Sequence, residues 1–337
     1  MLEDQRPGTI YWIDHYTVGT NNLDRWIEFH ERILGARTEL ASPERRERGI
    51  FQDLTNCHHG GFVQREAMPP SAGVAKSFPR YGYFVQPEDV EGHVRRLDTY
   101  NVPHLDPVRV SSDGEDGTAV YFEDPDGNQF EFWAPTRMPD GAMDGCGPLK
   151  IGRISHGVYG SRDLQRTAEF FNRYCALEPA KGADIPADTL VLPLAAGGRL
   201  VFKKVDSPAH RTSGRGAYRD LHTALVVRPE DFWPNYERVW NELPEWDFDE
   251  RNGRYAGDGE SLPPRMALHG SPAGRRWIAT FGRGDDWYDW DANLFHFFGG
   301  APKGGSMATY EPHSIEDYMD AYLEAHPRGP TPVQVIR

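Results

Sequence analysis

The sequence predicts an α+β protein built from four similar units, each with the order strand, helix, strand, strand, strand. Two observations support this prediction. The second half of the chain repeats the first half, and within each half a strand-like segment followed by an amphipathic helix occurs twice. A chain of 337 residues is also long enough to give such units substantial hydrophobic cores.

The internal repeat is visible as matched segments that keep a nearly constant offset along the chain. His15 matches His156, each within a strand-like segment that a helix follows, and Leu23 matches Leu164 at the same offset. Near the end of each half, segment 124–132 matches segment 289–297 at a larger offset. The second half is therefore a copy of the first with an insertion. We place this insertion in 241–265, where Pro, Gly and charged residues dominate.

Hydrophobic periodicity places the elements in the same order in both halves. Apolar residues three and four positions apart mark helices, and short β-branched or aromatic runs mark strands. In the first half, the predicted elements are a strand at 11–18, a helix at 23–35, a strand at 61–64, a strand at 81–85, a helix at 87–100 and strands at 108–110, 119–122 and 129–133. In the second half, they are a strand at 151–159, a helix at 164–177, a strand at 199–202 and a fourth unit across 221–298.

The composition argues against several classes of protein. Asp and Glu outnumber Lys and Arg by 51 to 37, and the net charge of −14 opposes binding to nucleic acid or to an anionic membrane. No apolar run reaches the roughly 18 residues of a membrane span, and the first residues lack the apolar core of a signal peptide. The three cysteines form neither a disulfide framework nor a CxxC metal pair. We therefore expect a soluble cytoplasmic protein that binds neither nucleic acid nor membrane.

Two motifs give the chain a family resemblance. One is the first strand with a central His15, and the other is a last strand that Asp-Pro-Asp-Gly-Asn introduces at 124–128 and that carries Glu131. This combination resembles the vicinal oxygen chelate superfamily, which includes glyoxalases, bleomycin resistance proteins and extradiol dioxygenases. The length of four units resembles the two-domain type I extradiol ring-cleavage dioxygenases within it.

The resemblance implies that the four units pair into two cupped half-barrel domains. We expect residues 8–138 to form an N-terminal pair of units without a catalytic role, and residues 139–149 to form a Gly-rich linker. Residues 150–300 would form the C-terminal pair with the metal, and 301–337 a C-terminal extension.

In extradiol enzymes, the metal is held by a His from the first strand of each C-terminal unit and a Glu from the last strand. Carried over by position, the resemblance implies His156 and His222 as ligands, with His296 at the position of the Glu. A third imidazole in place of a carboxylate would leave the site more positive. If the register of the last strand differs, Asp289 or Asp291 could complete the site instead.

The first half keeps part of the same pattern. His15 and Glu131 stand at ligand positions, but Arg80 or Tyr81 stands where the second half has His222. Two ligands rarely suffice for a tight divalent site. We therefore interpret His15 and Glu131 as a vestigial metal site, or as an alternative one in which the two halves combine.

Three further residues are candidates for chemistry by the same resemblance. His210 precedes His222 by about the spacing that the acid/base His keeps from the second metal His in extradiol enzymes. His269 stands where a residue behind the ligands helps to bind the substrate. Tyr288 is the nearest replacement for a Tyr that these enzymes carry behind the last ligand.

The function implied by the resemblance is ring cleavage of a catechol-like aromatic by O2 at a non-heme metal. Fe(II) is the expected cofactor, with Mn(II) or another divalent metal as alternatives. The expected partners are the small aromatic substrate, O2 and further copies of the chain in a homo-oligomer. Two other functions stay open: another metalloenzyme of the superfamily, such as an isomerase, lyase or transferase, or a metal-free protein that binds an aromatic ligand.

Overall fold

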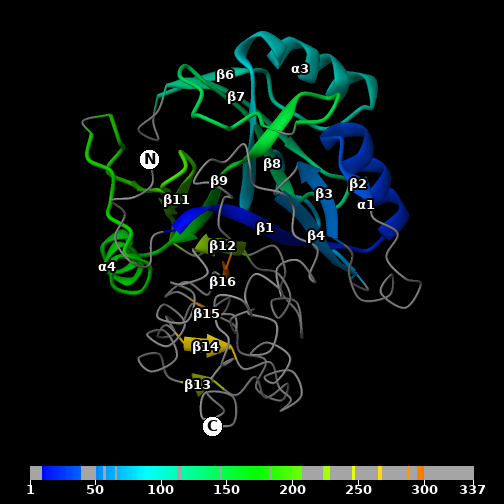
Figure 1. Cartoon of the computed structure of the whole chain (residues 1–337). Helices are drawn as coiled ribbons and strands as arrows, with labels where there is room; N and C mark the ends of the chain where they lie inside the picture. The colour runs from blue at the N-terminus through cyan, green and yellow to red at the C-terminus, as the bar shows by residue number, and fades with distance from the viewer. Residues whose placement is uncertain are drawn as a thin grey trace, which may run out of the picture.

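The fold is given by a computed structural model, and it is an α+β fold as the sequence predicts. The structure describes residues 10–38, 51–55, 58–64, 67–111, 116–144, 146–182 and 184–206, and strands at 223–227, 245–246, 265–267, 287–288 and 294–299. In the part of the chain that the structure describes, mixed sheets curl into half-barrels and helices are few (Figure 1). Among these residues, no helix is long and apolar enough to cross a membrane.

The first two units follow the predicted order of elements. The first contains β1 (Ile10–Thr20), α1 (Leu23–Phe29) with a π-helical continuation η1 (His30–Leu34), β2 (Arg37–Thr38), β3 (Phe51–Thr55) and β4 (His58–Gln64). The second contains β5 (Arg80–Val85), η2 (Pro87–Asp89), α3 (Val90–Thr99), β6 (Val108–Val110), β7 (Gly117–Glu123) and β8 (Gln129–Pro135).

The last two units are described less completely. The third contains β9 (Ile151–Ser161), α4 (Leu164–Cys175), β10 (Thr189–Pro193) and β11 (Arg199–Lys204). The fourth contains β12 (Thr223–Val227), β13 (Glu245–Trp246), β14 (Arg265–Ala267), β15 (Trp287–Tyr288) and β16 (Leu294–Gly299).

Side-chain caps begin two of the helices where the sequence predicts them. At α1, the Asn22 side chain accepts a hydrogen bond from the backbone N–H of Arg25 at 3.0 Å. At α4, Asp163 accepts from the N–H groups of Gln165 and Arg166, both at 3.1 Å. Each cap satisfies donors that the first helical turn leaves without an intrahelical acceptor.

The strands that the structure describes form two sheets. The nine-stranded sheet has the order β13-β14-β15-β16-β12-β1-β4-β3-β2, and the seven-stranded sheet has the order β10-β11-β9-β5-β8-β7-β6. At the centre of the first sheet, β1 pairs with β12 in antiparallel orientation, and at the centre of the second, β5 pairs with β9 in the same way. In Figure 1, β12 lies beside β1 although most of the chain separates them in sequence.

This pairing of units differs from the expected one. We expected the first unit to pair with the second, within 8–138, and the third with the fourth, within 150–300. In the structure, the first pairs with the fourth, with Ile10 opposite Val227, and the second pairs with the third. The physical reason is that the first strand of every unit pairs on one side with the last strand of the same unit. Its other edge offers the same kind of hydrogen-bonding groups in all units, so hydrogen bonding alone does not favour pairing with the adjacent unit.

A buried tyrosine cluster joins the two sheets. Tyr16 of β1 stacks on Tyr81 of β5 with ring centroids 4.1 Å apart, and its hydroxyl contacts that of Tyr83. The hydroxyls of Tyr81 and Tyr159 both lie within hydrogen-bond distance of Thr223 Oγ1, at 2.9 and 2.8 Å. These five residues, the tyrosine cluster, define the inner faces of both sheets, and neighbouring residues along each strand point outward.

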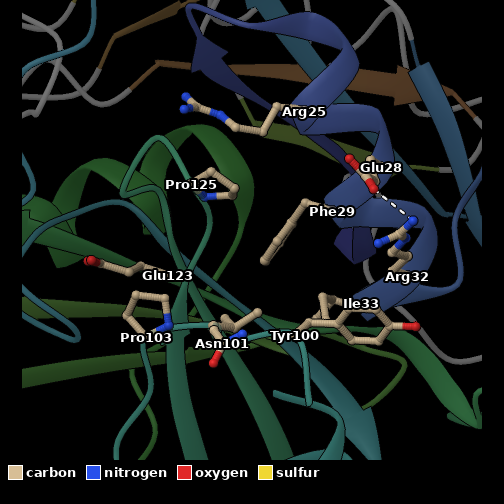
Figure 2. Close-up of a pocket in the computed structure, with 11 residues that line it drawn as sticks. Arg25, Glu28, Phe29, Arg32, Ile33, Tyr100, Asn101, Pro103, Glu123 and Pro125 are labelled. Atoms are coloured by element: carbon tan, nitrogen blue, oxygen red, sulfur yellow. Dashed lines mark ion pairs between the residues drawn. The ribbon is translucent and has the colours of Figure 1, made fainter. Parts of the chain in front are cut away.

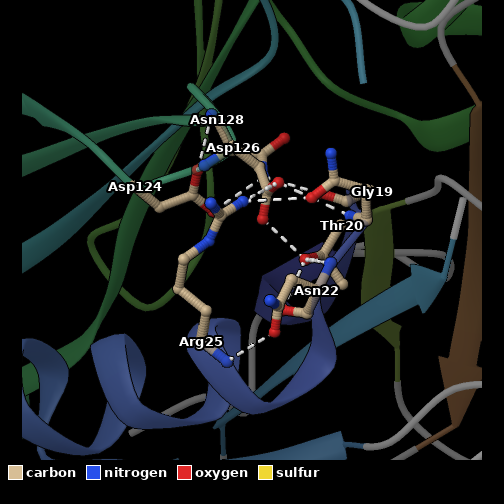
Figure 3. Close-up of polar contacts among 8 residues, drawn as sticks. Gly19, Thr20, Asn22, Arg25, Asp124, Asp126 and Asn128 are labelled. Atoms are coloured by element: carbon tan, nitrogen blue, oxygen red, sulfur yellow. Dashed lines mark hydrogen bonds and ion pairs between the residues drawn. The ribbon is translucent and has the colours of Figure 1, made fainter. Parts of the chain in front are cut away.

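The Asp-Pro-Asp-Gly-Asn turn between β7 and β8 ties the second unit to the first (Figure 3). Asp124 Oδ1 accepts hydrogen bonds from the backbone N–H groups of Asp126 and Asn128 at 2.9 and 2.8 Å. Asn128 Nδ2 donates to Gly19 O at the end of β1, and Asp126 accepts from Thr20 Oγ1 at 2.6 Å. Burial raises the pKa of Asp124 to about 7, although the hydrogen bonds from Asn128 and Asp126 act in the opposite direction. The motif therefore has a structural role as a clip, that is, a turn whose hydrogen bonds hold the second unit to the end of β1.

Replacing Asp124 with Ala removes the acceptor for these N–H groups, and we expect it to lower the free energy of unfolding by roughly 2–4 kcal/mol. The measurement is urea denaturation of the two proteins. Glu91→Ala is the matched control, because its ion pair with Arg95 is on the surface, with side chains 89% and 71% exposed, and should contribute less than about 1 kcal/mol. Equal stability of Asp124→Ala and the parent would refute the clip.

Candidate functional site

A cluster of charged side chains lies buried on the outer face of the seven-stranded sheet. Glu131 accepts at Oε2 from Arg80 Nε at 3.1 Å, and His156 Nε2 is 3.2 Å from the same oxygen. Arg199 stands opposite His156 in the register of β11 and β9. All four residues, which we call the Glu131 cluster, are at least nine-tenths buried.

Aromatic rings and one glycine shape this cluster. The guanidinium of Arg80 lies over the ring of Tyr121 at 4.7 Å, and that of Arg199 lies over Trp133 at 4.9 Å, both within the range of cation–π attraction. The imidazole of His156 lies against Gly82, where a Cβ atom would come within 2.3 Å of its Cε1. A residue with any side chain at position 82 would displace the histidine.

The charges around Glu131 determine its ionisation. Burial alone would raise the pKa of this carboxyl, but the charge and hydrogen bond of His156 and the charges of Arg80 and Arg199 outweigh burial and lower the pKa to about 2. Glu131 is therefore ionised at neutral pH and paired with cations of this chain.

The nine-stranded sheet carries a second row of possible ligands. In the strand register, His15 of β1 lies opposite Ala224 of β12, and Ala224 lies opposite His296 of β16. On its other side, His15 lies opposite His59 of β4. A single row across four neighbouring strands therefore contains three histidine positions.

The two rows correspond through the internal repeat. His15 matches His156, and Glu131 matches His296, each at the offset of the segment that contains it. Gly82, which pairs with both His156 and Glu131, matches Ala224 at the offset that also relates segment 85–89 to segment 227–231.

Each first-strand histidine follows a break in the strand register. The breaks lie between Ile13 and His15 in β1 and next to His156 in β9. The residue within each break bonds to the imidazole that follows it: Asp14 Oδ2 is 2.5 Å from His15 Nδ1, and Ser155 Oγ is 2.9 Å from His156 Nδ1. β-Bulges commonly redirect a side chain next to a site. Both histidines thus follow the same kind of irregularity in the backbone, but the side chain bonded to Nδ1 is a carboxylate at His15 and a hydroxyl at His156.

The structure places the predicted metal ligands His156 and His296 on different sheets. His156 lies on the seven-stranded sheet beside Glu131, whereas His296 belongs to β16 of the nine-stranded sheet. His210, His222 and His269 lie outside the described residues. Tyr288 is described only as a position in β15, where it pairs with Leu294, and His296 only as a position in β16. The alternative ligands Asp289 and Asp291 also lie outside the described residues.

Sequence reasoning missed several residues of the two rows. Arg199 was part of a predicted strand with no role, and His59 precedes the predicted strand at 61–64. Asp14 gave a usable signal, because a carboxylate inside an apolar strand segment and next to a histidine needs a polar partner. Among the described residues, no group of three or more His, Cys, Asp or Glu side chains could hold a metal ion.

A groove of about 310 Å³ lies elsewhere, between α1, the segment 100–103 and the β7–β8 turn (Figure 2). Its charged residues are already paired. Glu28 forms an ion pair with Arg32 at 2.8 Å, Arg25 forms one with Asp126 at 2.7 Å, and Glu123 accepts a hydrogen bond from the Gln129 amide. The groove is lined by none of the predicted site residues.

The first two units are similar to a known superfamily. Residues 12–132 match the model of the Glyoxalase/Bleomycin resistance protein/Dioxygenase superfamily. This match spans the first two units, and the described part of the chain has the α+β fold of vicinal oxygen chelate proteins. Vicinal oxygen chelate proteins of this superfamily are mostly enzymes, and they commonly bind divalent metal ions.

Two solved structures are similar to this chain over nearly their full lengths. A candidate dioxygenase from Bacillus subtilis is 16% identical with a TM-score of 0.55, and the match covers 95% of this chain and 94% of that one. Glyoxalase I from Zea mays is 12% identical with a TM-score of 0.53, and the match covers 93% and 96%. At these identities, the comparison establishes the shared fold and leaves the reaction undetermined.

The ionisation of Glu131 predicts an acid dependence of stability. The pKa is about 2 in the folded protein and about 4.3 in an unfolded chain, so the unfolded state binds more protons as the pH falls through this window. The stabilisation is complete above about pH 5 and is lost toward about pH 2. The stability difference between the parent and Glu131→Gln should therefore shrink as the pH is lowered.

The measurement is urea denaturation of both proteins from about pH 6 to about pH 3. Burial lowers the pKa of His30 to about 3 and is the main cause that lowers the pKa of His93 to about 4, so both also destabilise the fold in acid. Both proteins contain these histidines, and their effect cancels in the difference. A stability difference that is constant across this range would contradict the prediction.

Proposed function

We propose that the chain is a metal-dependent dioxygenase of the extradiol type, which cleaves the ring of a catechol-like aromatic with O2 at a site on the nine-stranded sheet. The observation that carries the proposal is the row that joins His15, Ala224 and His296. His222 stands two positions before Ala224 in the sequence. We therefore assign the metal to His15, His222 and His296, with His59 as a fourth ligand position, and replace His156 by His15 in the predicted set.

These donors fit a divalent transition metal. Imidazole is a good ligand for Fe(II) and for several other divalent ions, and we propose Fe(II), with Mn(II) or another divalent metal as alternatives. The Asp14 carboxylate accepts from Nδ1 of His15 and thereby favours the tautomer whose Nε2 lone pair binds metals. When bound, the metal would supply adjacent positions for two vicinal oxygens of the substrate and for O2.

The proposed chemistry also needs groups that move protons. We assign this role to His210, because an imidazole with a pKa of about 6.5 can accept a proton from a catechol hydroxyl and later return it to the product. His269 and Tyr288 are assigned to substrate binding beside the ligands. Asp14 acts through His15 and is a positioning residue.

Two alternatives follow from specific observations. The fold is shared with glyoxalase I as well as with a candidate dioxygenase, which favours another metalloenzyme, an isomerase, lyase or transferase, as the second candidate. A histidine at 296, where extradiol enzymes use a glutamate, favours a metal-free protein that binds an aromatic ligand as the third.

The proposed function predicts iron-dependent oxygen consumption. Protein purified without oxygen should contain bound iron, and it should take up O2 with 3-substituted catechols and form a ring-opened product, as measured with an oxygen electrode and by absorbance. Bound metal without O2 uptake would instead support the isomerase, lyase or transferase. Absence of metal, together with quenching of tryptophan fluorescence by an aromatic ligand, would support the binding protein.

The assignment of ligands predicts which histidines hold the metal. His15→Ala and His296→Ala should each lower metal affinity by at least about tenfold, because each removes one of three imidazole ligands. His156→Ala is the matched control and should leave the affinity unchanged, because His156 lies on the other sheet. Metal content after dialysis is the measurement. Loss of metal in His156→Ala with full retention in His15→Ala would reject the site on the nine-stranded sheet.

A further inference from the structure

The Glu131 cluster occupies the region of the seven-stranded sheet that matches the proposed metal site of the other sheet, and its donor set does not fit a metal. We infer that Arg80 is an internal cation that takes the place of a metal ion there, so that the seven-stranded sheet excludes divalent metals. The inference concerns a different sheet from the proposed function and does not depend on the reaction.

The repeat aligns the two sets of residues position by position. Arg80 matches His222 at the same offset that relates Gly82 to Ala224 on the same pair of strands. Glu131 corresponds to His296 in the last strand. Where one sheet has a possible imidazole ligand, the other therefore has a guanidinium, which carries only donors and has no lone pair for a metal.

The geometry shows that the arginine already neutralises the best ligand of the cluster. The carboxylate oxygen Oε2 of Glu131 lies 3.1 Å from Arg80 Nε and 3.2 Å from His156 Nε2. A metal on this oxygen would have to displace one or both contacts. Arg80 is 7% exposed, so the positive charge of its guanidinium would stay close to the incoming ion.

The second arginine strengthens the exclusion. Arg199 pairs in register with His156 and contributes to the low pKa of Glu131, so two fixed positive charges act on one carboxylate. A divalent cation placed among them would bring the local charge well above neutrality. Burial of such an excess positive charge is strongly unfavourable.

Packing over the outer face supports the same conclusion. Trp133, on the same face of β8 as Glu131, packs with Phe84 and Ala119 and with Ala142 of the segment that connects the two halves. Met138 and Met143 of this connecting segment also pack against this group. Side chains of the chain itself therefore cover this part of the outer face.

The test is the metal content of Arg80→His, which introduces the residue type found at the matching position 222. The expected result is a gain of one equivalent of bound divalent metal per chain over the parent, measured by elemental analysis after equilibration with Mn(II) or Fe(II) without oxygen. Arg80→Gln is the matched control, because it removes the charge without adding a ligand of this kind, and it should gain none. Adding Glu131→Gln to Arg80→His should abolish the gain.

A folded Arg80→His protein that gains no metal would overturn the inference. If that variant does not fold, His156→Ala in the otherwise unchanged chain decides the question. Unchanged metal content supports exclusion, and loss of one equivalent overturns it. A parent without metal would contradict the proposed function, whereas a gain in Arg80→His would still support this inference, so the two failures are distinguishable.

Discussion

The structure depends on how the first strand of each unit finds hydrogen-bonding partners for both of its edges. β1 lies between β4 and β12, and β9 lies between β11 and β5. A strand at the centre of a sheet needs hydrogen-bonding partners on both sides, and one unit supplies only one of them. No unit is therefore complete by itself. The choice of partner for the second edge decides which histidines share a sheet, and so it also decides where chemistry can occur.

The repeat and the order of elements could be predicted from the sequence, because periodicity is a local property. The strand around His15, the helix that begins at Leu23 and the turn at Asp124 all lie where their patterns indicate. The pairing of units could not be predicted in the same way. The first strands of the repeated units have equivalent edges, so the sequence pattern is the same whether a unit pairs with its neighbour or with a distant unit. Only the packing of whole units distinguishes the two arrangements.

The candidate site was predictable in its residue types and unpredictable in its grouping. His15, Glu131, His156 and His296 were identified as members of ligand sets from their positions in the repeat. Placing His156 with His296 required the adjacent pairing, and the structure instead places His156 with Glu131. Arg80 was the local signal that this neighbourhood differs, because a positive charge at a ligand position in a buried strand must find an anion nearby.

The pairing of β1 with β12 also has a consequence for the order in which the two sheets form during folding. The strands of the seven-stranded sheet come from one continuous stretch, Arg80 to Lys204, whereas the nine-stranded sheet joins Ile10 to Val227. Contacts between residues so distant in sequence form slowly, because a long loop must close first. During synthesis, the seven-stranded sheet can form before β12, the partner of β1, has been made. We therefore expect the row that contains His15 to be completed last, with the edge of β1 open to pairing with another chain until then.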